Sequence, residues 1–186
     1  MSHSDPARDL ATLRAQYEFV DELLERFDTQ LARAHAASSA WSPEHHLAHL
    51  ALANELVLKN VKNLVRGEGM LVVRGGEPHP GALPVLESGR IPRGRAQSPR
   101  MVRPPDAVDR ELLRQWLADA RKELAALDAR VVVATELKIP HQLLGPLDAP
   151  QWLRFGAVHT RHHLEIACEV LGAHVGASAL PELPPL

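Results

Sequence analysis

Apolar residues recur at spacings of three and four along four stretches of the chain, which is the period of an amphipathic helix. We expect helices over residues 6–36, 42–67, 106–127 and 148–171. In the first stretch the spacing is kept by Leu10, Leu13, Tyr17, Val20, Leu24, Phe27 and Leu31. The second has a proline in its first turn and a glycine at its end, both common at helix boundaries.

The fourth stretch carries the clearest boundary signals. Asp148 is suited to the N-cap, and Gln151 three residues later completes a capping box. Pro150 falls in the first turn, where its missing N–H costs nothing. Gly172 follows as a C-terminal stop. This stretch is therefore predicted as a helix with both ends defined.

The connections differ strongly in length. Residues 67–106 are rich in glycine and proline, so we predict a long crossover loop without a helix. Residues 130–135 are β-rich and short, and either extend the third helix or form a strand-like connector. Residues 139–147 are a turn-rich approach to the fourth helix, and residues 173–186 are a loose tail or lie over the surface.

These elements predict an all-α four-helix bundle, with residues 1–186 forming a single domain. The crossover between the second and third helices is long enough to run the length of the bundle. It allows those two helices to be parallel, which gives an up-down-down-up topology.

Composition narrows the functional class. Of 186 residues, 45% are hydrophobic and 24% charged, as in a soluble globular protein, and the net charge of −2 gives no general electrostatic case for nucleic acid. No apolar run approaches the length of a membrane span, and the N-terminus has no apolar signal core. The single cysteine, Cys168, fits a reducing compartment. We expect a cytoplasmic protein without membrane or nucleic-acid partners, whose exposed helix faces would allow a homodimer.

Histidine changes this picture, since eleven histidines outnumber the seven aromatic residues. His159 and His163 lie one turn apart on the inward stripe of the fourth helix. A single buried histidine is usually a hydrogen-bonded core residue. Two at positions i and i+4 can direct their ring nitrogens at one ion, as in a zincin helix. They therefore favour a metal site, which needs at least a third ligand.

The second helix is the obvious source of that ligand. His46 and His49 flank its apolar stripe, and helical geometry alone does not choose between them. His141 could also come near the site. Five arginines lie in the crossover: Arg90, Arg93, Arg95, Arg100 and Arg103. They indicate either a solvated loop or a lid that brings positive charge to an anionic substrate group.

Three motifs resemble the DinB-like (YfiT-like) superfamily of metal-dependent enzymes. They are WSPEHHLAHL at residues 41–50, LGPLDAPQWLRF at 144–155 with HTRHHL at 159–164, and IPRGRAQSP at 91–99. In architecture the resemblance covers residues 10–172. It implies that His49, His159 and His163 are the metal ligands. His46, His162, His141, Arg93 and Arg95 then become candidates for supporting or substrate-binding roles.

Three imidazoles with open positions form a catalytic rather than a closed structural arrangement, and imidazole suits several divalent transition metals, of which we expect zinc or nickel. The resemblance implies a thiol S-transferase or a hydrolase acting on a small molecule, with a low-molecular-weight thiol as one candidate cofactor. Glu55 and Glu165 project away from the stripe, so neither is placed as a general base. Two alternatives stay open: a non-catalytic bundle that binds a metal or a small ligand, and a bundle whose histidines are only core residues.

Overall fold

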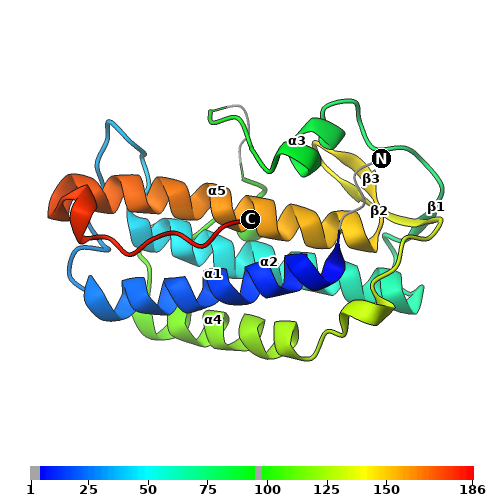
Figure 1. Cartoon of the computed structure of the whole chain (residues 1–186), viewed down its shortest axis with the longest axis horizontal. Coiled ribbons are helices and arrows are strands. Elements are labelled where there is room, and N and C mark those ends of the chain that lie inside the picture. The colour runs from blue at the N-terminus through cyan, green and yellow to red at the C-terminus, as the bar shows by residue number, and fades with distance from the viewer. Residues whose placement is uncertain (1–4, 95–97) are drawn as a thin grey trace.

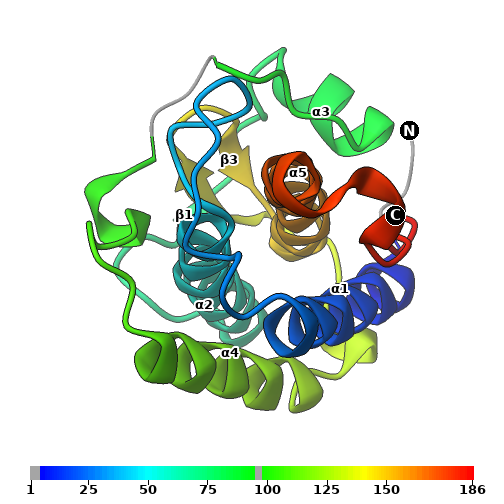
Figure 2. The ribbon, with the colours of Figure 1, turned by 90° about the vertical axis from the view of Figure 1, so that its left-hand side faces the viewer.

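The computed structural model describes residues 5–94 and 98–186. Four long helices lie side by side in it: α1 (Pro6–Arg26), α2 (Pro43–Arg66), α4 (Arg110–Ala125) and α5 (Ala149–Val175) (Figure 1). Seen end-on, α1 is diagonal to α2, and α4 is diagonal to α5 (Figure 2). Helices α1 and α5 run in one direction and α2 and α4 in the other, so the crossover joins parallel helices (Figure 1).

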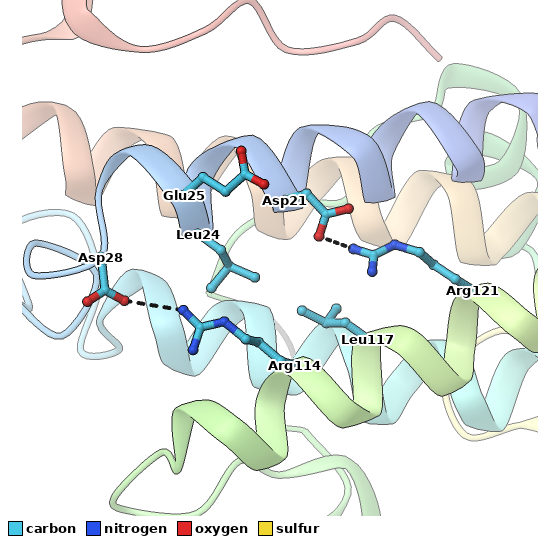
Figure 3. A pocket seen from close by; sticks show the side chains of 7 residues that line it. All are labelled: Asp21, Leu24, Glu25, Asp28, Arg114, Leu117 and Arg121. Carbon is cyan, nitrogen blue, oxygen red and sulfur yellow. Dashed lines mark hydrogen bonds and ion pairs between the residues drawn. The ribbon is translucent and has the colours of Figure 1, made fainter.

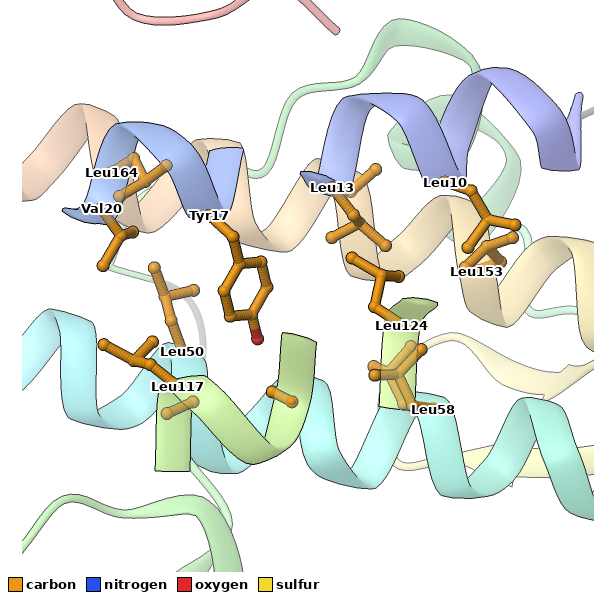
Figure 4. Packing of buried hydrophobic residues seen from close by; sticks show 14 of the residues in the cluster. Leu10, Leu13, Tyr17, Val20, Leu50, Leu58, Leu117, Leu124, Leu153 and Leu164 are labelled. Atoms are coloured by element: carbon orange, nitrogen blue, oxygen red, sulfur yellow. The ribbon is translucent and has the colours of Figure 1, made fainter. Parts of the chain in front are cut away.

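The core fills the space between the four helices and is dominated by leucine. Side chains from all four point into it, among them Leu13 of α1, Leu50 of α2, Leu117 of α4 and Leu164 of α5 (Figure 4). Burial of these apolar faces removes hydrocarbon from water and holds the helices together. The same packing fixes the spacing between α2, which carries His49, and α5, which carries His159 and His163.

A small antiparallel sheet closes one end of the molecule, so the expectation of an all-α protein is wrong in this part. Its strands are β1 (Val73–Arg74), β2 (Leu137–His141) and β3 (Gly145–Leu147), in the order β1-β2-β3. Strands β2 and β3 form a hairpin in the region predicted as a turn-rich approach. Ile139 and Leu147 pair in it and are both buried. Trp152 of α5 donates its indole N–H to the Ile139 carbonyl at 3.0 Å, which ties the hairpin to the start of that helix.

The crossover also departs from its prediction as a loop without a helix. It contains α3 (Ala82–Ser88) and a 3₁₀ turn, η1 (Arg100–Val102). Ala82 and Leu86 bury one face of α3, and Gly89 ends the helix in the left-handed conformation with φ 67°. A helix of two turns is too short to show a clear period, so tertiary packing decides it.

Helix ends follow the sequence where a local signal marks them. The Asp148–Gln151 capping box forms as predicted, and α2 ends at Gly67 with φ 68°. The first helix, however, ends at Arg26 rather than at residue 36. Leu31 nevertheless remains fully buried, because the chain turns inward and the Leu31 carbonyl accepts the Glu44 N–H at 3.0 Å.

Three further boundaries were misplaced. The third helix starts at Arg110 because the Asp109 carboxylate caps it by accepting two backbone N–H groups. Residues 130–135 neither extend that helix nor form a strand, since a 3₁₀ turn, η2 (Ala129–Val131), is followed by irregular chain. Gly172 does not stop α5, which continues to Val175 and ends at Gly176.

The C-terminal tail is laid over the surface rather than loose. After a 3₁₀ turn, η3 (Ala177–Ala179), it runs back along the helices (Figure 1). Arg161 and Arg8 each donate to a tail carbonyl at 2.5 Å, that of Pro184 and that of Leu186 respectively. No helix in the described part of the chain is long and apolar enough to cross a membrane.

Candidate metal centre

His49 of α2 is buried, and a hydrogen bond to the main chain determines which of its ring nitrogens carries the hydrogen. Its Nδ1 lies 2.7 Å from the main-chain oxygen of Val102 in the crossover. A carbonyl oxygen can only accept, so Nδ1 must carry the hydrogen and donate it. The neutral ring therefore presents its lone pair at Nε2. Metal-binding histidines usually have this arrangement, with the outer nitrogen held by a carbonyl or carboxylate.

His159 and His163 of α5 complete a group of three imidazoles with His49. One ring nitrogen from each lies within 4.8 Å of the other two, and His159 and His163 keep part of their surface exposed. The Nε2 atoms of His49 and His159 are 3.3 Å apart. The ring centroid of His163 lies 4.5 Å from that of His49 and 4.6 Å from that of His159. The i, i+4 spacing on α5 thus brings both rings to the same side of the helix.

His46 lies beside this group but outside it. Its Nδ1 is 3.0 Å from Nδ1 of His163, and its Nε2 is 3.0 Å from Oγ of Ser39 in the α1–α2 connection. Both ring nitrogens are thereby engaged in hydrogen bonds within the protein. The structure therefore places His49, rather than His46, with its lone pair facing the two histidines of α5.

Aromatic rings line two sides of the cluster. The indole of Trp41 lies with its centroid 5.3 Å from those of both His46 and His49 and is stacked on His163 at 6.3 Å. The ring of Phe155 lies 5.2 Å from His159. Both residues are half-buried, so they cover part of the imidazole surface with hydrocarbon.

His141 does not join the group of three. Its ring lies 4.5 Å from Phe155, which separates it from His159, and its Nδ1 accepts the N–H groups of Leu143 and Leu144. It thus holds the turn between β2 and β3. Burial lowers the pKa of His141 to about 4, so the ring is neutral and remains an acceptor at neutral pH.

The cluster consists of neutral bases. Burial is the main cause that lowers the pKa of His49, His159 and His163, and the neighbouring imidazoles lower it further for His159 and His163. Burial, and then the proximity of His49, lowers the pKa of His46 to about 3. Neutral imidazoles have lone pairs available at physiological pH, which is the protonation state that a metal requires.

The remaining candidates surround the cluster. The ring of His162 lies 5.2 Å from that of His163, and burial, then the charge of Arg93, lowers its pKa. Arg93 forms an ion pair with Glu169 at 2.6 Å, which anchors the crossover to α5. Arg95 lies outside the described residues. Glu165 pairs with Arg161 at 2.8 Å and points away from the cluster, as expected from the sequence.

The donor set fits a divalent transition metal. His159 Nδ1 is buried and has no hydrogen-bond partner in the described structure, so this ring is not a fully satisfied core histidine. His49 directs its Nε2 lone pair at Nε2 of the same ring, 3.3 Å away. Three neutral nitrogen donors at this separation are the ligands that zinc, nickel, copper or iron accept. The three histidines could therefore hold a metal ion.

A separate surface hollow lies between α1 and α4 and contains none of the clustered histidines. Charged residues line it around Leu24 and Leu117, with Arg114 near Asp28 at 3.6 Å and Arg121 paired with Asp21 (Figure 3). Two of its three carboxylates, those of Asp21 and Asp28, face arginines, and Glu25 is the third acidic side chain. The hollow therefore offers no converging set of groups for chemistry.

The helical fold and the buried imidazole cluster define a class: a mostly helical protein with a three-histidine group able to hold a metal. Comparison with protein families gives the same answer at a finer level, because the model of the DinB superfamily matches residues 12–167. The chain belongs to this superfamily. Comparison with curated proteins and with solved structures gives no significant match.

Three groups at the site were missed by the sequence analysis. The carbonyl of Val102 and the hydroxyl of Ser39 lie in connections without any periodic pattern, so no local signal marks them. Phe155 was noted only as the last residue of the DinB-like motif at residues 144–155. Trp41 was noted within the DinB-like motif, but its position against three imidazole rings required the folded structure.

Proposed function

We propose that this protein is a metal-dependent enzyme that binds a divalent transition metal, zinc or nickel, through His49, His159 and His163. The observation that carries the proposal is the His49 ring. Its outer nitrogen is fixed by the Val102 carbonyl at 2.7 Å, and its inner lone pair faces the two histidines of α5. When bound, such a metal supplies Lewis-acid activation of water or of a thiol.

The reaction class that fits this site is S-transfer or hydrolysis on a small molecule. Cys168 is a poor candidate for the nucleophile, because burial raises the pKa of its thiol to about 11. A thiol used in the reaction would therefore come from a low-molecular-weight cofactor. Trp41 and Phe155 cover two sides of the cluster, and Arg93, paired with Glu169, lies near His162 at its border.

Metal content tests the first part of this proposal. Elemental analysis of the purified protein should give one zinc or nickel per chain, and His163→Ala should abolish it. His79→Ala is the matched control, since His79 donates to the Leu143 carbonyl and is not a member of the group of three, and it should leave the stoichiometry unchanged. Wild-type protein that holds no stoichiometric metal after exposure to zinc and nickel would refute the assignment.

Trp41 provides a second measurement in solution. Because the centroid of its ring lies within 6.3 Å of those of two proposed ligands, His49 and His163, Ni²⁺ should quench its fluorescence. The quenching should disappear in Trp41→Phe but persist in Trp116→Phe. Turnover of a panel of electrophiles with several thiols then distinguishes an enzyme from a metal-binding protein without activity.

A further inference from the structure

His46 has the contacts of a residue that positions a metal ligand. It lies one turn before His49 on α2, its side chain is only 3% exposed, and it is not a member of the group of three. Its Nδ1 lies 3.0 Å from Nδ1 of His163 in α5, and its Nε2 lies 3.0 Å from Oγ of Ser39 in the α1–α2 connection. A buried imidazole placed between a candidate ligand and a hydroxyl can fix which nitrogen of that ligand carries hydrogen.

The hydrogens in this chain can be assigned once His163 is a ligand. Its Nδ1 is already engaged with His46 Nδ1, so only Nε2 is available to an ion. A neutral ring that offers Nε2 carries its hydrogen on Nδ1, and His163 must therefore donate to His46. The single hydrogen of His46 is then on Nε2 and is donated to the Ser39 hydroxyl oxygen.

The opposite assignment prevents metal binding. If His46 donated from Nδ1, His163 would accept there and would carry its own hydrogen on Nε2. The Ser39 hydroxyl would then donate to His46 Nε2. Each ring holds one hydrogen in both arrangements. The two arrangements differ in which nitrogen of His163 and of His46 carries it, and in whether the Ser39 hydroxyl accepts from His46 or donates to it. Only the first arrangement leaves the His163 Nε2 lone pair free.

We propose that Ser39 and His46 form a hydrogen-bond relay that holds His163 in the Nδ1–H tautomer required for metal binding. This inference rests on the proposed function and assigns positioning residues to the same site. The position of Ser39 is itself fixed, because its Oγ also accepts the Trp41 N–H at 3.0 Å. Thus the connection that places Trp41 over the cluster also places the end of the relay.

Metal affinity of matched variants tests the relay. Cobalt(II) titration, followed by its visible absorption, should show affinity lowered about 10- to 100-fold in His46→Leu, the range typical of lost outer partners of metal ligands. His46→Asn, whose amide oxygen can accept in place of Nδ1, should recover much of the loss. Ser39→Ala should weaken affinity by a smaller factor. His45→Leu and Ser38→Ala are the controls, since these neighbours bond to other groups and should bind cobalt like wild type.

Nitrogen-15 NMR of the imidazole rings gives a readout that a purely structural role would not move. In the zinc-loaded wild type, His163 should be the Nδ1–H tautomer and His46 the Nε2–H tautomer. Wild type that binds no metal would refute the proposed function and the relay together. Wild type that binds metal would refute the relay alone if His46 carried its hydrogen on Nδ1, or if His46→Leu bound cobalt as tightly as wild type.

Discussion

Gly156 sets how closely α5 approaches α2, and Gly156→Ala should separate the two helices. A Cβ atom added at this glycine would lie 2.9 Å from Cγ1 of Val57, closer than real Cβ contacts come. Val57 cannot turn away easily, since it is β-branched and only 2% exposed. The backbones of α2 and α5 must therefore shift, and His159 lies less than one turn from the substitution.

Two opposing effects determine the size of the change. Alanine is favoured over glycine within a helix by roughly 1 kcal/mol. Overpacking a tight core costs roughly 1–3 kcal/mol. We expect a net loss of about 1 kcal/mol in the free energy of unfolding, or about 3 °C in Tm for a chain of this length. The shift should also weaken metal binding about tenfold, as loss of ligand orientation does.

A double-mutant cycle with Val57→Ala isolates the contact. Val57→Ala alone leaves a cavity and should cost about 2 kcal/mol. In the double variant the added methyl occupies part of that space. The loss in the free energy of unfolding should therefore be smaller than the sum of the two single losses by about 1–2 kcal/mol. Urea unfolding and cobalt titration of the four proteins give all quantities. This prediction would be refuted if Gly156→Ala were more stable than wild type by the full roughly 1 kcal/mol of helix propensity and bound cobalt equally well. The close approach of α5 to α2 would then not control the geometry of the metal site.

Three further predictions concern other parts of the molecule. Metal-free protein should lose stability as the pH falls from 6.5 to 4, because the unfolded chain binds a proton at His141 that the folded ring, with its pKa of about 4, does not. This contribution is complete above pH 6.5 and smaller by about 2 kcal/mol at pH 5, so urea unfolding should show a smaller loss in His141→Asn. Arg154→Met removes the cation 3.0 Å from the buried Asp9 carboxylate and should cost roughly 3–5 kcal/mol in chemical denaturation; an unchanged midpoint would contradict this. Zinc should slow tryptic cleavage after Arg100, since the carbonyl two residues later is bonded to His49, and equal rates with and without zinc would argue against that coupling.

The long helices could be predicted from the sequence because their period and their caps agree. The capping box at the start of α5 and the glycine after α2 are local signals, and both form as expected. The end of α1 has no such signal. Phe27 and Leu31 continue the apolar spacing beyond Arg26 and are still buried, although the chain that carries them has left the helix. Periodicity reports burial, and here burial extends further than the helix.

Short elements were missed for a different reason. Helix α3 has seven residues, and the β2–β3 hairpin is shorter than the stretch over which alternation can be distinguished from chance. Neither element is stable by itself. The hairpin depends on burial of the Ile139–Leu147 pair and on the hydrogen bond from the indole of Trp152 in α5, which is a tertiary contact.

The candidate site likewise has a part that helix spacing predicts and a part that it does not. The spacing of His159 and His163 places them together on one helix face and could be read directly, whereas the choice of His49 over His46 required the family resemblance. The groups that set the hydrogens on these rings, Ser39 and the Val102 carbonyl, lie in connections between helices. Helix period brings the lone pairs together, and the connections hold one nitrogen of the His49 ring directly and one nitrogen of the His163 ring through His46. Substitutions in the connections should therefore change metal affinity before they change stability, whereas substitutions on the buried helix faces should act in the opposite order.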